Sequence, residues 1–255
     1  MVICERISIK ERREPLNQFL EWAVTTPLQV EVISIWIITG LIIVLVFAVN
    51  HAVKKADVMA KPTGLVLLGV LIVQTFGTIT RDNMGKHNAS GYAPYIGALA
   101  LFLLFSNISG LFGLAQPTAN YSVTLTLALI SFVLIQRAVF KTNGFVKFFT
   151  RLFEPYPVFF IMNFFGAVAP LVSMSLRLFG NITGGTIIMM LFYTFTGYIS
   201  GFIPVIGQFD FIGPLVAPFL HAYFDLFVGF IQMYVFISLT TVFVANELPS
   251  EPETT

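Results

Sequence analysis

The stretch SMSLRLFGNITGG, Ser173–Gly185, decides how this chain is interpreted, because Arg177 lies within it. Between Glu154 and Asp210 this arginine is the only charged side chain in a long apolar run. A guanidinium stays protonated at any physiological pH. A permanent cation at the centre of a membrane helix costs roughly 2.5 to 3.5 kcal/mol even on lenient insertion scales. The arginine therefore indicates a function rather than a contribution to stability.

The composition predicts an all-α integral membrane protein. The chain has 255 residues, of which 56% are hydrophobic and 11% are charged, whereas about a quarter of the residues in a soluble domain are charged. A net charge of +1 and the lack of a basic arm with interleaved aromatic residues give no sign of a nucleic-acid partner. The single cysteine, Cys4, excludes an internal disulfide framework and a multi-cysteine metal site.

Hydropathy along the chain predicts about five membrane helices, which cover residues 32–50, 94–113, 121–138, 157–196 and 211–245. The apolar part of residues 62–80 is shorter than the ~20 residues that a crossing helix needs, so an interfacial helix is expected there. Residues 1–30 mix both charges and are expected to lie outside the membrane or at its surface, without a signal peptide. The acidic, proline-containing residues 247–255 are expected to be disordered.

Basic residues indicate which side of the membrane the loops occupy. Lys54, Lys55 and Lys61 follow the first predicted span. Two crossings later, a second basic group follows the third span, and it consists of Arg137, Lys141, Lys147 and Arg151. Both groups therefore fall on one side, which the positive-inside rule assigns to the cytoplasm. The neutral turn AQPTAN, residues 115–120, faces the other side.

The last two apolar segments are too long for an upright crossing. Each has about 35 residues and would measure ~50 Å as a helix, whereas the hydrocarbon core is ~30 Å thick. Each segment must tilt steeply or break, and Gly166, Pro170, Pro214 and Pro218 are places where a helix could bend.

Helical spacing groups the polar residues of these two segments into stripes, since residues three, four and seven apart share a face. One stripe holds Arg177 with Ser173, Gly180, Asn181 and Gly184. Its small residues would let another helix approach closely, so Gly180 and Gly184 are predicted helix-packing positions and the charge is presented to a neighbour.

The second stripe holds Asp225, the only formal charge between Asp210 and Glu247, together with His221, Gly229 and Gln232. A carboxylate, an imidazole and an amide on one face form a plausible proton or cation path. The alternative is a buried Arg177–Asp225 ion pair that only fixes the hairpin. That alternative leaves the small and polar residues of both stripes unexplained.

Outside the two stripes, few sequence features point to a role. Asn107, inside an apolar span, is expected to form an interhelical hydrogen bond. The sequence has no phosphate loop, HExxH motif, nucleophile elbow or cofactor-binding motif. We therefore expect no nucleotide hydrolysis, cofactor or metal centre.

The chain resembles the subunit a family of F-type ATP synthases, the membrane stator subunits beside the ring of c subunits. The family motif around the arginine is matched at every constrained position, by Ser173, Ser175, Leu176, Arg177, Leu178, Gly180 and Asn181. The resemblance extends over roughly residues 30–246 and includes KPTGL at 61–65, FSNISGLFGLAQPTANYSVTLTLAL at 105–129 and FDLFVGFIQMYVFISLTTVFVA at 224–245.

This resemblance implies that the two long segments are tilted helices against the c-ring. Arg177 would face each passing ring carboxylate and separate two half-channels, so that proton or sodium flow drives rotation. The subunit would be non-catalytic by itself, because ATP forms in other subunits. Implied partners are the c-ring, the peripheral stalk subunit b, other ATP synthase subunits and the lipid bilayer. The implied location is an energy-coupling membrane, most simply the bacterial plasma membrane.

The chain departs from many bacterial members of the family at two positions. They have a glutamate where this chain has Thr186, and a histidine where it has Asp225. Asp225 is therefore expected to be the relay residue, with His221 as a helper. The rest of the expected ion pathway consists of Ser173, Asn181, Thr186 and Gln232. Two other functions remain open, an autonomous channel or secondary transporter with an Arg/Asp gate, and a membrane scaffold in which Arg177 is structural.

Overall fold

The computed structural model describes residues 29–57, 61–153, 156–202 and 212–248. The expectations for residues 1–28 and 249–255 lie outside this part. Eight longer elements make up the described chain: α2 (Val30–Lys55), α3 (Gly64–Met84), α4 (Lys86–Ile108), α5 (Tyr121–Phe153), α6 (Phe160–Ser200), α7 (Ile212–His221), the π-helical turn η4 (Ala222–Val228) and α8 (Gly229–Glu247). Short 3₁₀ turns are η1 (Ser109–Phe112), η2 (Pro117–Ala119) and η3 (Pro157–Phe159).

The described part of the chain is helical, without a strand, and six of its helices are long and apolar enough to cross a membrane. The all-α membrane fold class is thereby confirmed. The count exceeds the expected five because α3 has 21 residues and continues through Arg81–Met84. The argument that this segment is too short to cross is therefore wrong, while its interfacial placement stays a prediction.

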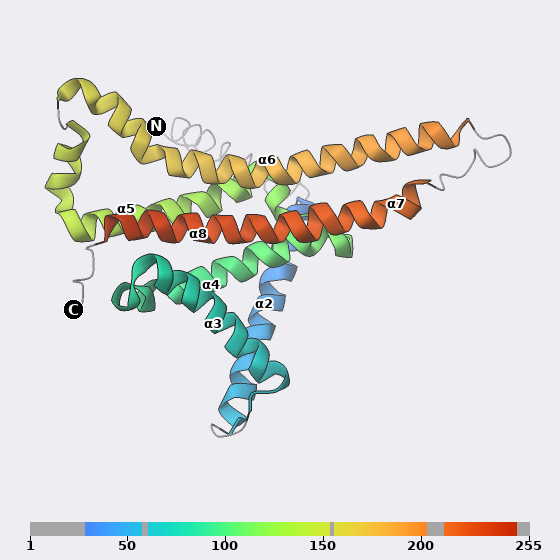
Figure 1. The fold of residues 1–255 in the computed structure, drawn as a ribbon, viewed down its shortest axis with the longest axis horizontal. Coiled ribbons are helices and arrows are strands. Elements are labelled where there is room, and N and C mark those ends of the chain that lie inside the picture. The colour runs from blue at the N-terminus through green and yellow to red at the C-terminus, as the bar shows by residue number, and fades with distance from the viewer. Residues whose placement is uncertain (1–28, 58–60, 154–155, 203–211, 249–255) are drawn as a thin grey trace, which may run out of the picture.

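The two long segments form a helical hairpin, in which α6 runs alongside α7 and α8 (Figure 1). Helix α6 continues unbroken for 41 residues despite Pro170, a length of roughly 60 Å. Proline removes one backbone hydrogen bond and crowds the carbonyl four residues earlier. Here the residue four positions earlier is Gly166. The sequence left open whether each long segment tilts or breaks, and the first segment does not break.

The second segment is also one continuous helical column, but its geometry changes in the middle. Helix α7 leads into the π turn η4, and helical backbone angles at His221 and Gly229 join it to both neighbours. Pro218 lies one turn before η4 and has no N–H for the carbonyl of Pro214. The sequence marked this region as a place to bend, and the structure has a π turn there instead of a break.

The neutral turn and the first basic group lie at opposite ends of α2. The side chain of Asn120, which follows η2, donates a hydrogen bond to Gln29 at the start of α2, with an N···O distance of 3.5 Å. Lys54 and Lys55 lie in the last turn of the same helix. This arrangement agrees with the sidedness inferred from the charges.

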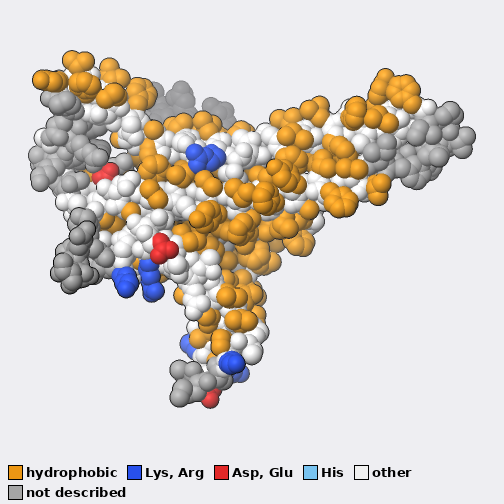
Figure 2. Space-filling model, viewed as in Figure 1, with side chains coloured by type: hydrophobic (Ala, Val, Ile, Leu, Met, Phe, Trp, Pro, Cys, Tyr) orange, Lys and Arg blue, Asp and Glu red, His pale blue; other side chains and the backbone are white. Residues whose placement is uncertain are grey.

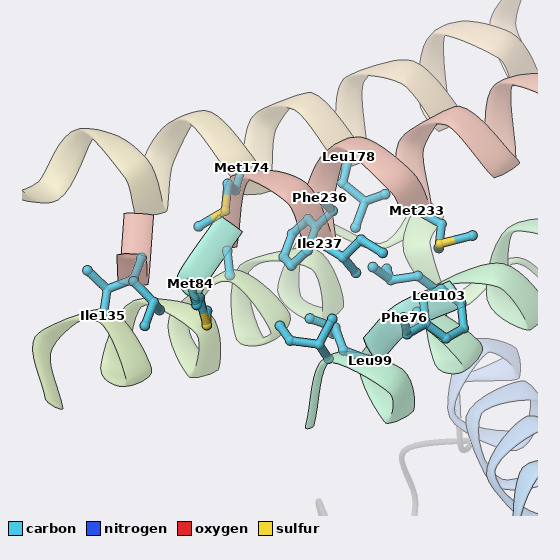
Figure 3. Close-up of a cluster of buried hydrophobic side chains, with 14 of the residues drawn as sticks. Phe76, Met84, Leu99, Leu103, Ile135, Met174, Leu178, Met233, Phe236 and Ile237 are labelled. Atoms are coloured by element: carbon cyan, nitrogen blue, oxygen red, sulfur yellow. The ribbon is translucent and has the colours of Figure 1, made fainter. Parts of the chain in front are cut away.

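Helix α8 is central to the packing, because it contacts α3, α4, α5 and α6 (Figure 1). Its buried side chains Met233, Phe236 and Ile237 meet Met174 and Leu178 of α6, with Leu103 of α4 nearby (Figure 3). In lipid such helices associate through close packing and hydrogen bonds, since lipid tails are as apolar as the side chains. The outer surface is correspondingly hydrophobic over large areas (Figure 2).

Gly229 permits the closest approach between α4 and α8. A Cβ atom added there would lie 2.9 Å from Cβ of Asn107. Real Cβ atoms essentially never come that close, so an added methyl group would force α4 or α8 to shift. The small side chain is therefore required at this crossing.

We predict that Gly229→Ala destabilises the protein by about 1–3 kcal/mol, the usual cost of overpacking. Gly40→Ala is the matched control, because an added methyl group on α2 meets nothing within 4 Å there. The change from glycine to alanine raises the intrinsic helix preference equally at both positions. The difference between their melting temperatures, measured in lipid nanodiscs, therefore gives the cost of packing. Equal melting temperatures for the two variants would refute the tight crossing.

Candidate functional site

A chain of four polar side chains runs through the π turn. His221 Nδ1 lies 2.8 Å from Asp225 Oδ2, and His221 Nε2 lies 3.1 Å from the Tyr193 hydroxyl. On the other side of the carboxylate, Gln116 Nε2 donates a hydrogen bond to Asp225 Oδ1 at 3.1 Å. The side chains come from α6, the end of α7, η4 and the turn before η2. Together they form one connected chain of hydrogen bonds.

Asp225 is less exposed than its histidine partner, with side-chain exposures of 17% and 38%. Its carboxylate lies in the π turn, and such turns inside helices are frequent at functional sites. The spacing of His221 and Asp225 correctly placed the two on one face. The π turn itself was not predicted, because no spacing pattern distinguishes it from an α-helix.

Gln116 was missed in the sequence analysis, where its turn was described only as a neutral connection. Besides Asp225, its amide donates to the backbone carbonyl of Asn107 at 2.9 Å. The side chain lies directly over Gly110, where any added Cβ would be too close to the amide. Gln116 is thus held in place on both sides, which fixes the amide toward Asp225.

Asn107 is buried, at 1% exposure, and connects three elements. Its amide donates to the Gly229 carbonyl at 2.9 Å, so the interhelical hydrogen bond expected for this residue is present. Its side-chain oxygen accepts a hydrogen bond from Thr118 of η2, also at 2.9 Å. The asparagine therefore fixes the position of the turn that carries Gln116 relative to α8.

A cavity of about 360 Å³, which we call the Asp225 cavity, is lined by Asn107, Gln116, His221 and Asp225 of this network. Five of the predicted pathway residues line it, together with Glu31 of α2 and Gln116; the five are Asn181, Thr186, His221, Asp225 and Gln232. Gln232 is nearly buried, and the Thr186 hydroxyl donates to the Ile182 carbonyl at 3.0 Å. The structure thus brings the Asp225 stripe and part of the Arg177 stripe into one space.

Arg177 and the small residues beside it lie elsewhere. Arg177 and Ser173 are exposed and do not line the cavity. A Cβ added at Gly180 or Gly184 meets nothing within 4 Å. The glycine of α6 that packs within the chain is Gly185, which lies against Phe224. Within the described chain the face at Gly180 and Gly184 is open, so their packing against another helix stays a prediction.

The alternative in which Arg177 and Asp225 form a buried ion pair is wrong for the described residues. Asp225 pairs with His221, and Arg177 forms no hydrogen bond or ion pair within residues 29–57, 61–153, 156–202 and 212–248. The guanidinium therefore projects from α6 as an exposed cation.

A second cavity, of about 350 Å³, lies at the other end of the hairpin, and we call it the Glu247 cavity. Its polar residues were not singled out in the sequence, because they come from stretches that lie far apart along the chain; they are Gln136, Asn163, Asn246 and Glu247. The side-chain oxygen of Gln136 is buried without a hydrogen-bond partner in the described part of the chain. This end is therefore polar and incompletely satisfied.

Arg177 falls between the two cavities along α6. The residues of α6 that line the Glu247 cavity end at Pro170, and those that line the Asp225 cavity begin at Asn181. On α8 the two linings are likewise separated, by a stretch that includes the buried Phe236 and Ile237. A packed layer that is mostly apolar, with the buried hydroxyls of Ser175, Thr240 and Thr241, therefore divides two polar spaces. The exposed cation lies at the level of that layer.

The described residues contain no cluster of three histidine, cysteine, aspartate or glutamate side chains that could hold a metal ion.

Comparison with known proteins gives a family match over most of the chain. The family model "ATP synthase A chain" matches residues 32–245. The "ATP synthase subunit a, sodium ion specific" of Propionigenium modestum is 39% identical over 173 residues, which are 62% of this chain and 54% of that protein. The "ATP synthase subunit a" of Mycoplasma pneumoniae is 32% identical over 227 residues, covering 82% of this chain and 76% of that protein. The subunit of the same name from Aliarcobacter butzleri is 32% identical over 226 residues, covering 86% and 91%.

We predict that Asn107→Ala destabilises the protein by about 1–3 kcal/mol, because the variant leaves buried partners of the amide unsatisfied. Asn88→Ala is the matched control, since the Asn88 amide makes only a 3.4 Å hydrogen bond in a partly exposed position. Thermal unfolding in nanodiscs measures the difference. Unchanged stability of Asn107→Ala would show that the asparagine does not hold the turn to α8.

Proposed function

Since this chain belongs to the ATP synthase subunit a family, whose model matches residues 32–245, we propose that its two cavities are half-channels that meet a c-ring on either side of Arg177. The family membership makes the chain an ion-translocating, non-catalytic subunit of the membrane sector of an F-type ATP synthase. With bacterial relatives and six apolar helices, it is a multi-pass plasma-membrane protein that assembles with other ATP synthase subunits.

The position of Arg177 between two polar cavities is the observation that carries this proposal. A continuous pore would let ions cross without doing work. Two half-channels that end at an apolar layer force each ion to leave one cavity, travel on a carrier and enter the other. The buried Met174 and Leu178 on α6 supply that layer next to the arginine.

The c-ring is the partner that fits the open face of α6. Arg177 has no counter-charge within the described chain, and Gly180 and Gly184 leave room for a close helix. A ring helix that carries a carboxylate supplies both the charge and the packing surface. The peripheral stalk subunit b is a further proposed partner, which we place by the family resemblance alone.

Each step of the cycle then depends on the protonation state of the ring carboxylate. A carboxylate that releases its proton into one half-channel becomes an anion, and Arg177 attracts only this form because the guanidinium is always charged. Reprotonation from the other half-channel releases it into the lipid. Moving one elementary charge through 100 mV provides ~2.3 kcal/mol. Several such steps drive one ATP formed elsewhere in the complex.

Asp225 is the proposed relay group of its half-channel. Its carboxylate accepts a proton from His221, whose other nitrogen contacts the Tyr193 hydroxyl, so the chain can pass protons in sequence. Gln116 orients the carboxylate, and Asn181, Thr186 and Gln232 supply further polar groups around the cavity. Ser173 lies outside both cavities, and its proposed place is at the ring-facing surface beside Arg177.

We predict that Arg177→Ala leaves the complex assembled but abolishes ATP synthesis and coupled ion transport. The ring carboxylate would lose the cation that favours its ionised form beside α6. Assembly is measured by purification of the complex, and function by ATP synthesis in energised vesicles. Arg137→Ala, which removes an exposed cation from α5 outside both cavities, is the matched control and is expected to retain synthesis.

Two results would contradict this assignment. Retained synthesis in Arg177→Ala would exclude the electrostatic role. Loss of assembly would favour a scaffold, in which the arginine holds subunits together. Ion flux through the purified chain alone would instead support an autonomous channel or transporter.

We predict that Asp225→Asn slows ion translocation at least about tenfold while the complex stays intact, since a positioned proton-transfer group contributes roughly 10²–10⁴-fold to a rate. Gln116→Leu keeps the carboxylate but removes its amide donor, so a smaller decrease is expected. Asp82→Asn on α3 is the control, because this exposed carboxylate lines neither cavity. An unchanged rate in Asp225→Asn would remove the residue from the pathway.

A further inference from the structure

A third cavity lies between α2, α3 and α4 and has a volume of about 650 Å³. It shares no lining residue with the Asp225 or Glu247 cavity. Its size lies within the range of roughly 300–1,000 Å³ that is typical of ligand pockets. Most of its wall is apolar, from side chains such as Ile42 and Val46 of α2, Ile72 and Phe76 of α3, and Leu101 of α4.

One end of this cavity is cationic. Arg81 lies in the last turn of α3 and Lys86 is the first residue of α4, and both line the cavity. Gly85 between them has a φ of 77°, a conformation that glycine adopts readily, so the chain turns sharply and brings the two cations to the same end. Neither cation forms an ion pair with another residue in the described part of the chain. Asp82 adjoins Arg81 but does not line the cavity.

The start of α4 adds to this positive end. Its N-cap residue, Gly85, offers no side-chain hydrogen bond to the first N–H groups of the helix. Free N–H groups and the helix dipole favour an anion at such a terminus. The two side-chain charges and the start of α4 therefore favour an anion, while the C-terminus of α3, which ends at Met84, opposes them in part.

Small residues keep the apolar part of the cavity open. A Cβ added at Gly77 of α3 or Gly97 of α4 meets nothing within 4 Å, although both glycines line the space. A neighbouring apolar cavity of about 300 Å³ shares Val46, Ile72, Val73 and Leu101 with the first, and extends its lining to Val49 and Val53 of α2. An elongated apolar groove thus leads away from the cationic end.

We propose that an anionic phospholipid occupies this groove, with its phosphate at Arg81 and Lys86 and an acyl chain along α2, α3 and α4. Basic pockets between membrane helices recognise anionic lipid headgroups in this way. No carboxylate lines the cavity, so a zwitterionic lipid would find no partner for its ammonium group. An apolar helix of another subunit would cover the two cations without supplying a counter-charge, which is costly.

The test compares lipids that stay bound to the purified, assembled ATP synthase containing this chain. The complex is washed in detergent, exchanged into nanodiscs that contain phosphatidylglycerol and phosphatidylcholine, purified again in detergent, and its retained lipids are measured by mass spectrometry. One variant, Arg81→Gln with Lys86→Gln, removes the charges. A second, Gly97→Leu, fills the apolar groove and keeps both charges. The matched controls are Arg137→Gln with Lys141→Gln on α5, and Gly40→Leu on α2, all outside the groove.

We expect the wild-type complex and both controls to retain phosphatidylglycerol over phosphatidylcholine, and each groove variant to lose this excess. Equal retention of phosphatidylglycerol in all complexes would overturn the proposal, as would retention without a preference between the two lipids. A Gly97→Cys variant that cross-links to another subunit in the assembled complex would also overturn it, because a protein helix would then fill the groove. Since ion translocation is not the readout, failure here leaves the half-channel proposal unaffected.

Discussion

The hydrogen bonds of Asn107 are the interaction on which the polar site depends. Inside a membrane, polar groups find no water and must be satisfied within the protein. Asn107 meets this requirement for the Gly229 carbonyl and the Thr118 hydroxyl at once. The backbone carbonyl of Asn107 accepts a hydrogen bond from the Gln116 amide, which also donates one to Asp225. Asn107 therefore helps to orient the Asp225 carboxylate through Gln116, without a hydrogen bond to the carboxylate itself.

The same close crossing explains why the hairpin has two polar ends and an apolar middle. Where Gly229 lets α8 approach α4, the polar side chains gather around Asp225. Further along, large apolar side chains of α6 and α8 pack against one another (Figure 3). Polar residues reappear around Glu247. Under the proposed function, the packed side chains between the two cavities would separate the half-channels without a moving gate in this chain.

Arg177 is placed at the surface of this closed layer rather than within it. If the guanidinium were paired with Asp225 inside the chain, its charge would be satisfied and unavailable to a partner. The histidine takes that position instead, at 2.8 Å from the carboxylate. The pairing of Asp225 with His221 thus leaves one cation free to act outward. The same reasoning applies to the groove at Arg81 and Lys86. These cations have no ion-pair partner in the described part of the chain, so they are available to the proposed anionic lipid.

The sequence by itself determined the membrane class, the long hairpin, the two polar stripes and the family, because hydropathy and helical spacing depend only on neighbours along the chain. It also indicated that Asn107 would bond between helices. The tertiary structure decided which residues meet across elements. Gln116, Tyr193 and Thr118 join the site through contacts between segments as far as 109 residues apart, which no local pattern encodes. Packing also decided three further features: the open face at Gly180 and Gly184, the buried position of Gly185, and the π turn at Asp225. A glycine or an aspartate has the same spacing in the sequence whether it faces another helix or empty space.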